Sequence, residues 1–317
     1  MTELPTYQDI LRAADKIAPY AIQTPVKSWA IIDDLVGVSL FFKCENFQKM
    51  GAFKFRGACN AVMSLTDEEA FRGVATHSSG NHAAAVALAA KLRGIHALIV
   101  TPKTTSEFKT NNIKKYGGKI VFCEPTLASR ETTLAKIIEK TGHVEIHSYN
   151  DPHIIAGQGT AALELLEEVS DLDLVLVPVG GGGLLSGTAL TVNGLSPVTK
   201  VIGTEPAGAD DAYRSFREGR IIPSVNPKTI CDGLRTSLGT RTFAIIRKHV
   251  HDIVRVSEEK IIKAMRLIYE KTDMLIEPSS AVPLGALLEK KIDTTGKRIG
   301  IILSGGNIDP EKLSLKG

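Results

Sequence analysis

From residue 40 onward, short apolar and β-branched runs alternate with alanine-rich or amphipathic stretches, and this alternation limits the fold more than any other feature of the chain. The stretches 81–93, 154–169 and 257–273 are expected to be helices. The strand candidates are "LFFKCE", "GVATHS", "HALIVTP", "KIVFCEP", "HVEIHS", "LDLVLVPV", "KVIGTEP", "DIVRVS" and "RIGIILS". The alternation predicts an α/β protein, with a mostly parallel sheet and helices on both faces.

Length, charge and cysteine spacing exclude several classes of protein. The 317 residues suffice for two compact domains or one large one, and 38 basic residues nearly balance 35 acidic ones, so nucleic acid is a poor candidate partner. The cysteines lack CxxC spacing, which is typical of a reducing compartment, and they are Cys44, Cys59, Cys123 and Cys231. The first 17 residues resemble an amphipathic helix, and no apolar run approaches membrane-spanning length. We therefore expect a soluble, cytoplasmic protein without membrane contact.

Three of the predicted strands end in glycine-rich turns, namely "THSSGNH" (76–82), "VPVGGGGLLSG" (177–187) and "ILSGGNID" (302–309). Ligands of open parallel sheets bind where the strands end, at the carboxyl edge. Three such loops at one edge would therefore line one site. The last loop presents Ser304 at the end of a buried strand, with an ordinary polar turn as the alternative.

The second of these loops holds four consecutive glycines, which are Gly180, Gly181, Gly182 and Gly183. Without Cβ atoms, successive amides can surround an anion, and the start of the next helix adds a favourable partial charge. The loop is thus a candidate phosphate cradle, with a tight strand-to-helix turn as the alternative. It lacks the ending of a Walker loop and the third glycine of G-x-G-x-x-G, but Glu205 lies where a ribose-binding acid would be expected.

The "SSGN" loop brings Ser78 and Ser79 next to the amides of Gly80, Asn81 and His82, just before a predicted helix. Such a set of hydroxyls and amides suits a carboxylate. Capping of the helix by serine or asparagine is an equally good interpretation. His82 lies in an alanine-rich helix, where a packed histidine is expected.

One lysine stands in apolar surroundings, because "GAFKFRGA" places Lys54 between Phe53 and Phe55. Burying an ammonium there would cost on the order of several kcal/mol unless its pKa falls. Lysines desolvated in this way are the ones that form Schiff bases. A lysine whose stem merely covers apolar surface is the alternative.

Five motifs in this order cover almost the whole chain, and they are "KCENFQKMGAFKFRGA", "THSSGNHAAAVALAAK", "AGQGTAALEL", "VPVGGGGLLSG" and "ILSGGNID". Together they resemble the fold type II pyridoxal phosphate enzymes and, more narrowly, the serine racemase and serine/threonine dehydratase family. The resemblance implies two domains, each with a mostly parallel twisted sheet flanked by helices. Residues 1–62 and 151–317 would form the large cofactor-binding domain. Residues 63–150 would form a small mobile domain that closes over substrate, and the protein would be a homodimer.

The resemblance also gives roles to single residues. Lys54 would carry pyridoxal 5'-phosphate covalently and act as base on the Cα proton, next to Phe53. Asn81 would hydrogen-bond the ring hydroxyl, and Ser304 would face the pyridine nitrogen and leave it largely unprotonated. The phosphate would be held by backbone amides of Gly180, Gly181, Gly182, Gly183 and Leu184. Contacts to substrate would come from Ser78, Ser79, Asn81, His82, Asn150 and Gly233.

Ser79 separates two activities within this family. Inverting a stereocentre needs proton donors on both faces of a planar intermediate, so a group must stand opposite Lys54, whereas elimination needs only one. Racemases of the family contain "SSGN" and many threonine dehydratases "SAGN". We therefore expect a serine racemase that also dehydrates L-serine to pyruvate and ammonia. The alternative is an L-threonine/L-serine ammonia-lyase or a 3-hydroxyaspartate dehydratase without significant racemisation.

A cation site is implied by "GTEPAGADDAY". Glu205, the Ala209 carbonyl and Asp211 match the pattern by which serine racemases hold Mg²⁺, Ca²⁺ or Mn²⁺, a hard oxygen set. This assignment removes Glu205 from the ribose role. Without the resemblance, Asp210 and Asp211 would be interpreted as caps of the following helix.

Two departures from animal serine racemases limit the resemblance. This chain has "GNHAAAV" where those enzymes carry a glutamine, and Met50 replaces a threonine. Both changes lie near the nucleotide-effector region of the animal enzymes, so ATP activation is not carried over. A nucleotide-binding dehydrogenase and a non-catalytic ligand-binding module stay open as functions of another class.

Overall fold

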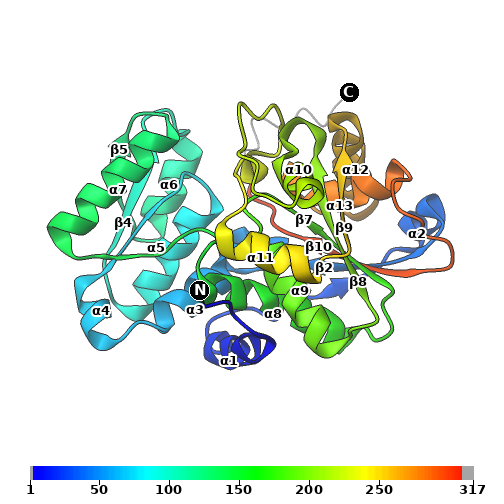
Figure 1. The fold of residues 1–317 in the computed structure, drawn as a ribbon, viewed down its shortest axis with the longest axis horizontal. Helices are drawn as coiled ribbons and strands as arrows, with labels where there is room; N and C mark the ends of the chain where they lie inside the picture. The colour runs from blue at the N-terminus through cyan, green and yellow to red at the C-terminus, as the bar shows by residue number, and fades with distance from the viewer. Residues whose placement is uncertain (1–2, 309–317) are drawn as a thin grey trace.

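The computed structural model describes residues 3–308, which form two sheets with helices packed around each (Figure 1). The strands are β1 Val26–Lys27, β2 Ser39–Cys44, β3 Val74–His77, β4 Ala97–Pro102, β5 Lys119–Cys123, β6 Val144–Glu145, β7 Leu174–Pro178, β8 Lys200–Pro206, β9 Asp252–Val256 and β10 Arg298–Leu303. The helices are α1 Tyr7–Ile17, α2 Ala30–Val36, α3 Lys54–Met63, α4 Asp67–Arg72, α5 Asn81–Arg93, α6 Glu107–Lys115, α7 Leu127–Thr141, α8 Pro152–Glu168, α9 Gly183–Leu195, α10 Asp211–Glu218, α11 Thr240–His249, α12 Glu258–Thr272 and α13 Pro278–Leu288.

The larger sheet has six strands in the order β1-β2-β10-β7-β8-β9. Only β1 runs antiparallel, and the other five strands are parallel to one another. Strands β7 and β10 are buried along almost their whole length, which explains why their sequences are nearly continuous apolar runs. Since the five strands are parallel, their carboxyl ends meet at one edge of the sheet.

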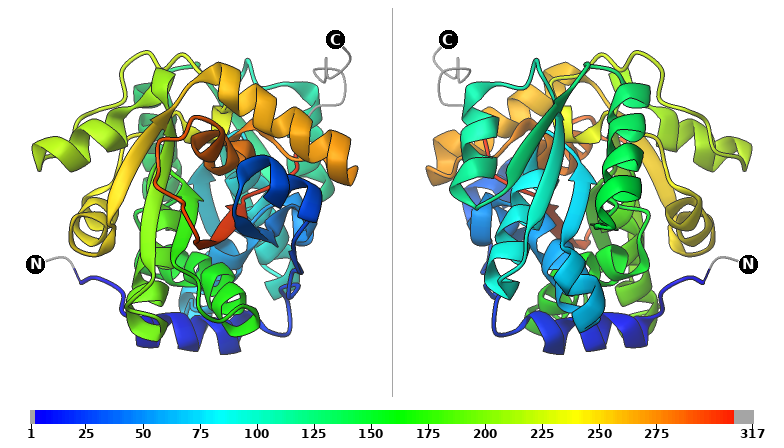
Figure 2. Two further views of the ribbon diagram at one scale, coloured as in Figure 1. Left: turned by 90° about the vertical axis from the view of Figure 1, so that its right-hand side faces the viewer. Right: turned by 90° about the vertical axis from the view of Figure 1, so that its left-hand side faces the viewer.

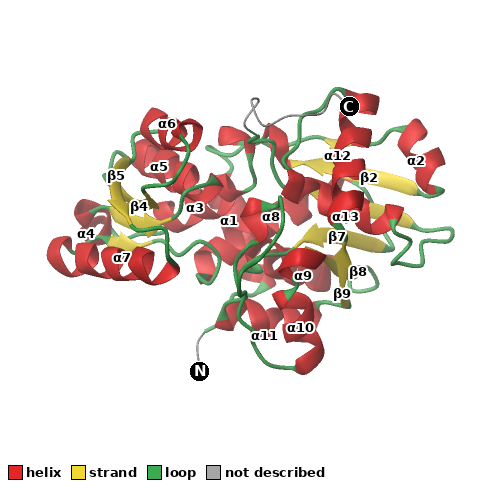
Figure 3. Ribbon diagram, turned by 90° about the horizontal axis from the view of Figure 1, so that it is seen from above, coloured by secondary structure: helices red, strands yellow, loops and turns green. Residues whose placement is uncertain are grey.

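The smaller sheet has four parallel strands in the order β5-β4-β3-β6, and all of them come from residues 74–145. Its elements form a separate group at the left of Figure 1, and Figure 3 shows α3 and α8 between the two sheets. Strand β6 is only two residues long, much shorter than the predicted "HVEIHS" run.

All strands except β1 were predicted from the sequence, and so were several of the helices. The expected helices correspond to α5, α8 and α12, and all nine strand candidates contain a strand, so the α/β class and the mostly parallel sheets are confirmed. The amphipathic N-terminal helix is α1, at the bottom of both views in Figure 2, and it begins with a capping box between Thr6 and Asp9. Strand β1 was missed because two residues are too few for a periodic signal.

Helices α3, α8 and α9 pack with their backbones almost in contact, and this packing depends on glycine. A Cβ added to Gly157 would lie 2.6 Å from the Cα of Gly57, and one added to Gly187 would lie 2.5 Å from the amide nitrogen of Gly159. No side chain fits into either space. The stretch "AGQGTAALEL" is therefore explained by close helix packing rather than by contact with a ligand.

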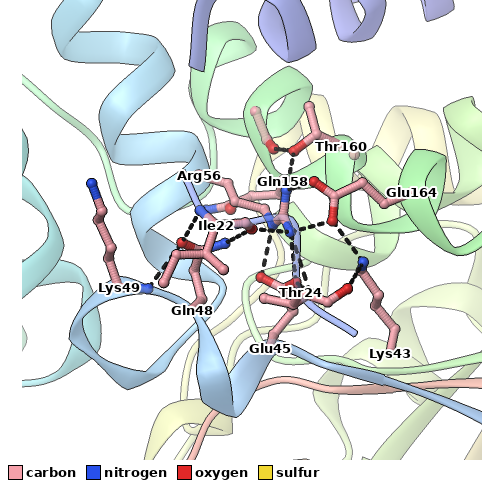
Figure 4. Close-up of polar contacts among 12 residues, drawn as sticks. Ile22, Thr24, Lys43, Glu45, Gln48, Lys49, Arg56, Gln158, Thr160 and Glu164 are labelled. Carbon is pink, nitrogen blue, oxygen red and sulfur yellow. Dashed lines mark hydrogen bonds and ion pairs between the residues drawn. The ribbon is translucent and has the colours of Figure 1, made fainter. Parts of the chain in front are cut away.

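A cluster of charges anchors α3 to the turn after β2 and to α8 (Figure 4). The Arg56 guanidinium donates to both carboxylate oxygens of Glu45, at 2.7 and 2.8 Å, and to both oxygens of Glu164, at 2.6 and 2.7 Å. The Lys43 ammonium lies 2.6 Å from Glu164. Burial alone would raise the pKa of Glu164, but Arg56 and Lys43 outweigh this effect and lower it. Two basic and two acidic groups balance, so the buried charge is compensated.

Among residues 3–308, no helix combines the length and apolar character required to cross a lipid bilayer.

Candidate active site

The "GAFK" turn and the Ser304 turn are joined by backbone contacts, although they lie about 250 residues apart. Ala52 and Gly305 form an antiparallel bridge, and the amide of Phe53 donates to the Ser304 carbonyl at 3.0 Å. Just before this bridge, Met50 has a φ of 55°, a left-handed conformation that is uncommon outside glycine. The turn between β2 and α3 is thereby held against the end of β10.

Lys54 is the first residue of α3 and is partly buried. Its Nζ donates to the backbone carbonyl of Ser148 at 2.8 Å and lies 5.2 Å from the centre of the Phe53 ring. Burial lowers the pKa of Lys54 to about 8, although the charge of Glu277 opposes this shift. An amine with such a pKa is far more often unprotonated near neutral pH than an ordinary lysine, as a nucleophile or base requires.

The glycine loop between β7 and α9 presents unused amides. Within residues 3–308, no acceptor takes a hydrogen bond from the backbone N–H of Gly181, Gly182, Gly183 or Leu184. Gly182 has a φ of 89°, and a Cβ on Gly181 would lie 2.3 Å from the ring of Tyr149. Only glycine therefore fits this loop, and its free amides at the start of α9 suit a phosphate group.

Asn81 lies in a polar chain that the sequence analysis did not foresee. Its side-chain amide donates to both carboxylate oxygens of Glu277, at 2.9 and 3.2 Å, and its carbonyl accepts from Asn307 at 3.0 Å. Glu277 is buried, and burial raises its pKa to about 7 against the opposing effect of the Asn81 hydrogen bond. The local sequence "IEPSS" has no pattern that marks Glu277, which enters the site only through its long-range contact with Asn81.

Ser304 is buried at the carboxyl end of β10, and its hydroxyl lies 3.0 Å from that of Ser280 in α13. It was predicted as a site residue, whereas Ser280 was not. The Ser280 hydroxyl also bonds the amide and the carbonyl of Gly305, the residue that pairs with Ala52 in the bridge.

The "SSGN" loop follows β3 and borders a cavity of about 300 Å³. Ser79 and Asn81 line this cavity together with Gly51 and Asn307. Ser78 does not cap the helix, because its hydroxyl accepts from the amide of Gly80 at 3.3 Å within the loop. Gly80 is the N-cap residue and supplies no side chain, so the alternative of ordinary side-chain capping is wrong.

His82 is packed, as the alanine-rich helix predicted. Its ring is buried, and Nε2 lies 3.0 Å from the Ile146 carbonyl. Burial and the charge of Lys54 lower its pKa to about 3, so the ring is neutral at physiological pH. His147 was not singled out from the sequence; its Nδ1 accepts from the amides of Tyr149 and Asn150, and burial lowers its pKa to about 4.

The other two expected substrate contacts, Asn150 and Gly233, are not among the residues that line this cavity. The Asn150 side-chain carbonyl accepts from the Arg241 amide at 2.8 Å, and its side-chain amide donates to the Thr240 hydroxyl at 3.3 Å. Both ends of Asn150 are thus engaged by the start of α11. Gly233 lies in a short 3₁₀ turn, where its carbonyl oxygen would be 3.1 Å from a Cβ on Gly180.

The acidic residues at the end of β8 and the start of α10 do not follow the interpretation in which Asp210 and Asp211 cap the helix. Glu205 is buried, and its carboxylate oxygens accept from the amides of Ala212 and Tyr213 at 2.9 and 2.8 Å. It therefore caps α10 itself, with one backbone donor on each oxygen, so each oxygen keeps one acceptor position. Asp210 makes no side-chain cap, so that expectation was wrong.

Among the residues that the structure describes, neither carboxylate oxygen of Asp211 accepts a hydrogen bond of ordinary geometry, although both are buried and the Ser224 side chain is near enough to oppose the rise of its pKa. Burial raises its pKa to about 6, and burial together with the charge of Asp211 raises the pKa of Glu205 well above its usual range. Two neighbouring carboxyls of this kind favour a cation. Within residues 3–308, no three His, Cys, Asp or Glu side chains gather, so any such site would depend on the Ala209 carbonyl and water.

Comparison with known proteins gives consistent results over the whole chain. Residues 17–305 match the sequence model of a family described as pyridoxal-phosphate dependent enzyme. The β-hydroxyaspartate dehydratase of Paracoccus denitrificans is 50% identical over 98% of this chain and 98% of its own length. The serine racemase of Arabidopsis thaliana is also 50% identical, over 95% of this chain and 92% of its own.

Solved structures give the same relationship. The structure of maize serine racemase has a TM-score of 0.96 to this chain and is 46% identical, with 98% of this chain and 96% of that chain covered. The fold type II assignment and the family resemblance are thereby confirmed. Racemases and dehydratases match at similar identity, so the comparisons do not separate these two activities.

Proposed function

Because the chain belongs to the family of pyridoxal-phosphate-dependent enzymes, we propose that it interconverts L- and D-serine and dehydrates L-serine to pyruvate and ammonia. The observation that carries the proposal is Ser79, a second hydroxyl in the "SSGN" loop that borders the same cavity as Asn81. Lys54 has the lowered pKa of a base, and the Ser79 hydroxyl would be the second group. Two such groups are the minimum that inversion requires.

The residues of the site fit pyridoxal phosphate. The free amides of the glycine loop would hold its phosphate, Lys54 would hold it covalently, and Asn81 and Ser304 would contact its ring. When bound, this cofactor withdraws electrons from the Cα atom of the amino acid that it carries, which makes the Cα proton labile.

The residues of the chain then decide where that proton goes. The Lys54 Nζ accepts the proton from one face of Cα, which its pKa of about 8 allows near neutral pH. For racemisation, the Ser79 hydroxyl delivers a proton to the opposite face. For dehydration, Lys54 alone is sufficient, because the proton that its Nζ takes from Cα can be returned to the β-hydroxyl, which then leaves as water.

The test is chiral chromatography of the purified enzyme with L-serine and Mg²⁺, with D-serine and pyruvate measured in the same sample. We expect both products. Ser79→Ala should abolish D-serine formation while pyruvate formation from L-serine continues. Equal loss of both products would overturn the two-base assignment, and pyruvate alone from the unaltered enzyme would make it a dehydratase.

A second candidate is 3-hydroxyaspartate dehydration, which the 50% identity to a β-hydroxyaspartate dehydratase over 98% of both chains favours. Its substrate adds a β-carboxylate to the serine skeleton, so the choice depends on the shape and charge of the pocket. Comparing kcat/KM for L-serine, L-threonine and 3-hydroxyaspartate separates the candidates. A value for 3-hydroxyaspartate more than about tenfold above that for serine would make this reaction the principal one, a difference of about 1.4 kcal/mol in transition-state binding.

We also propose a divalent cation, Mg²⁺, Ca²⁺ or Mn²⁺, held by Glu205, the Ala209 carbonyl and Asp211. Its support is the pair of buried oxygens of Asp211, which accept no hydrogen bond of ordinary geometry from the described residues, beside the raised pKa of Glu205. Asp211→Asn should abolish the rise in melting temperature that each cation gives to the unaltered protein. Asp210→Asn is the matched control, because Asp210 pairs with Arg214 and Arg255 at the surface instead. An equal rise in all three proteins would disprove the site.

The remaining parts of the proposal concern movement, assembly and location. We propose that residues 63–150 move as a small domain and carry the "SSGN" loop over substrate, since the smaller sheet lies wholly within them. A homodimer is proposed from the family resemblance, and analytical ultracentrifugation tests it. All four cysteines are free, which supports a reducing, cytoplasmic location.

A further inference from the structure

We propose that Ser280 is a positioning residue that controls the direction of the Ser304 hydroxyl hydrogen. The inference rests on the proposed function, because it takes Ser304 to face the cofactor's pyridine nitrogen. Ser280 lies in the first turn of α13 and is completely buried, and Ser304 is 2% exposed. Neither hydroxyl depends on bulk water for a partner.

The Ser280 hydroxyl has three close polar neighbours. Its oxygen lies 2.7 Å from the amide of Gly305, 2.7 Å from the carbonyl of Gly305 and 3.0 Å from the Ser304 hydroxyl. A serine hydroxyl has one hydrogen and two acceptor positions. The amide can only donate to it and the carbonyl can only accept from it. In this arrangement Ser304 must donate to Ser280, and it then offers only lone pairs to any other group.

A second arrangement of hydrogens is available at little cost. The Gly305 carbonyl also accepts from the amide of Glu277 at 3.0 Å, so it keeps a partner when the Ser280 hydrogen turns away. Ser280 can then donate to Ser304, and the Ser304 hydrogen becomes free to point elsewhere. Within this set of groups, only the Ser304 hydrogen is then without a partner in the protein, and a bound nitrogen can accept it.

The two arrangements of hydrogens suit different protonation states of the ring nitrogen. The first matches a protonated nitrogen, which needs an acceptor, and the second matches an unprotonated nitrogen, which needs a donor. In the second arrangement Ser280, Ser304 and the nitrogen form a chain in which each hydrogen bond strengthens the next. Ser280 therefore supports Ser304 as a donor to an unprotonated nitrogen, the state expected where serine replaces a carboxylate.

The experiment is ¹⁵N NMR of the holoenzyme that carries pyridoxal phosphate labelled at the ring nitrogen, together with titration of cofactor affinity. In Ser280→Ala we expect the ring-nitrogen signal to move toward that of a pyridine without a hydrogen bond. We also expect affinity to fall about five- to tenfold, the effect of one net hydrogen bond. Ser280→Thr keeps the hydroxyl and should restore both values.

Thr191→Val is the matched control, because it removes a buried hydroxyl that donates to the Gly159 carbonyl in α8. It should lower stability but leave the nitrogen signal in place. If Ser280→Ala leaves the nitrogen signal unchanged while Ser304→Ala shifts it, the role of Ser280 is overturned and the placement of Ser304 is kept. If Ser304→Ala also leaves the signal unchanged, Ser304 does not face the nitrogen, and the placement of the cofactor in the proposed function fails instead.

Discussion

Two cationic side chains, Lys54 and Arg56, lie two residues apart at the start of α3, and they differ in the number of carboxylates around them. The Arg56 guanidinium is enclosed by the carboxylates of Glu45 and Glu164, and these hold its pKa above the usual range although burial opposes the charge. The Lys54 ammonium has one backbone carbonyl as hydrogen-bond partner, and burial lowers its pKa to about 8. The comparison teaches that a buried cation with matched carboxylates is structural, whereas one without them is available for chemistry.

The largest effect should come from removing the reactive cation. Lys54→Ala should lower kcat for both products by about 10⁴-fold, the upper end for a lost general base, while the free energy of unfolding changes little. Product formation and urea unfolding measure the two quantities. Lys49→Ala is the matched control, because Lys49 lies over the Phe55 ring at 5.7 Å much as Lys54 lies over Phe53. Comparable losses in both variants would remove the distinction between Lys54 and other lysines.

The next largest effect should come from the structural cation. Arg56→Met leaves the buried Glu45 carboxylate without its ion-pair partner and Glu164 with Lys43 alone, and it should lower the free energy of unfolding by about 3–5 kcal/mol. Arg56→Lys should recover part of this loss, since an ammonium cannot bind both carboxylates in bidentate fashion. Urea denaturation of the cofactor-free proteins provides the values. A loss below about 1 kcal/mol combined with abolished catalysis would instead assign Arg56 to the reaction.

A smaller effect on stability concerns Glu277, the carboxyl whose charge raises the pKa of Lys54. Its pKa is raised from 4.5 to about 7, so between these pH values the folded protein binds more protons than the unfolded chain. Stability should therefore fall as pH rises from 4.5 to 7, by about 3 kcal/mol at most. Glu277→Gln should flatten this part of the profile in the cofactor-free protein.

Glu259→Gln serves as the control for that profile, because Glu259 is an exposed carboxylate of α12. The profile should keep its slope in this variant. If Glu277→Gln leaves the slope intact as well, the proton is bound elsewhere, and the pairing of Glu277 with Asn81 does not tune the site.

The sequence predicted the parts of this molecule that depend on local pattern. The alternation of apolar runs with helical stretches, together with the glycine-rich turns, was enough to find the strands. The apolar neighbours of Lys54 were enough to mark it as unusual. Contacts between distant residues were not accessible in this way. Glu277 and Asn81 are 196 residues apart, and the acidic partners of Arg56 come from the turn after β2 and from α8, so no window of sequence contains them together.

Glu205 illustrates the same limit from another side. The spacing of Glu205 after the glycine loop suggested a ribose contact, and Asp210 and Asp211 were the candidates for capping the next helix. In the structure, Glu205 itself caps α10. An acid at a strand end can turn toward a ligand, a cation or the next helix, and the side-chain pattern is the same in each case. Only the position of the α10 amides decides between them.

The place of β10 in the larger sheet has a consequence for synthesis on the ribosome. This strand lies between β2 and β7, and its end supplies both Ser304 and the bridge to Ala52. The smaller sheet uses only residues 74–145 and can form early, but the larger one keeps two unpaired strand edges until residues 298–303 have emerged. The nascent chain therefore has no complete site until β10 has been translated, and stalling just before β10 would leave an aggregation-prone intermediate.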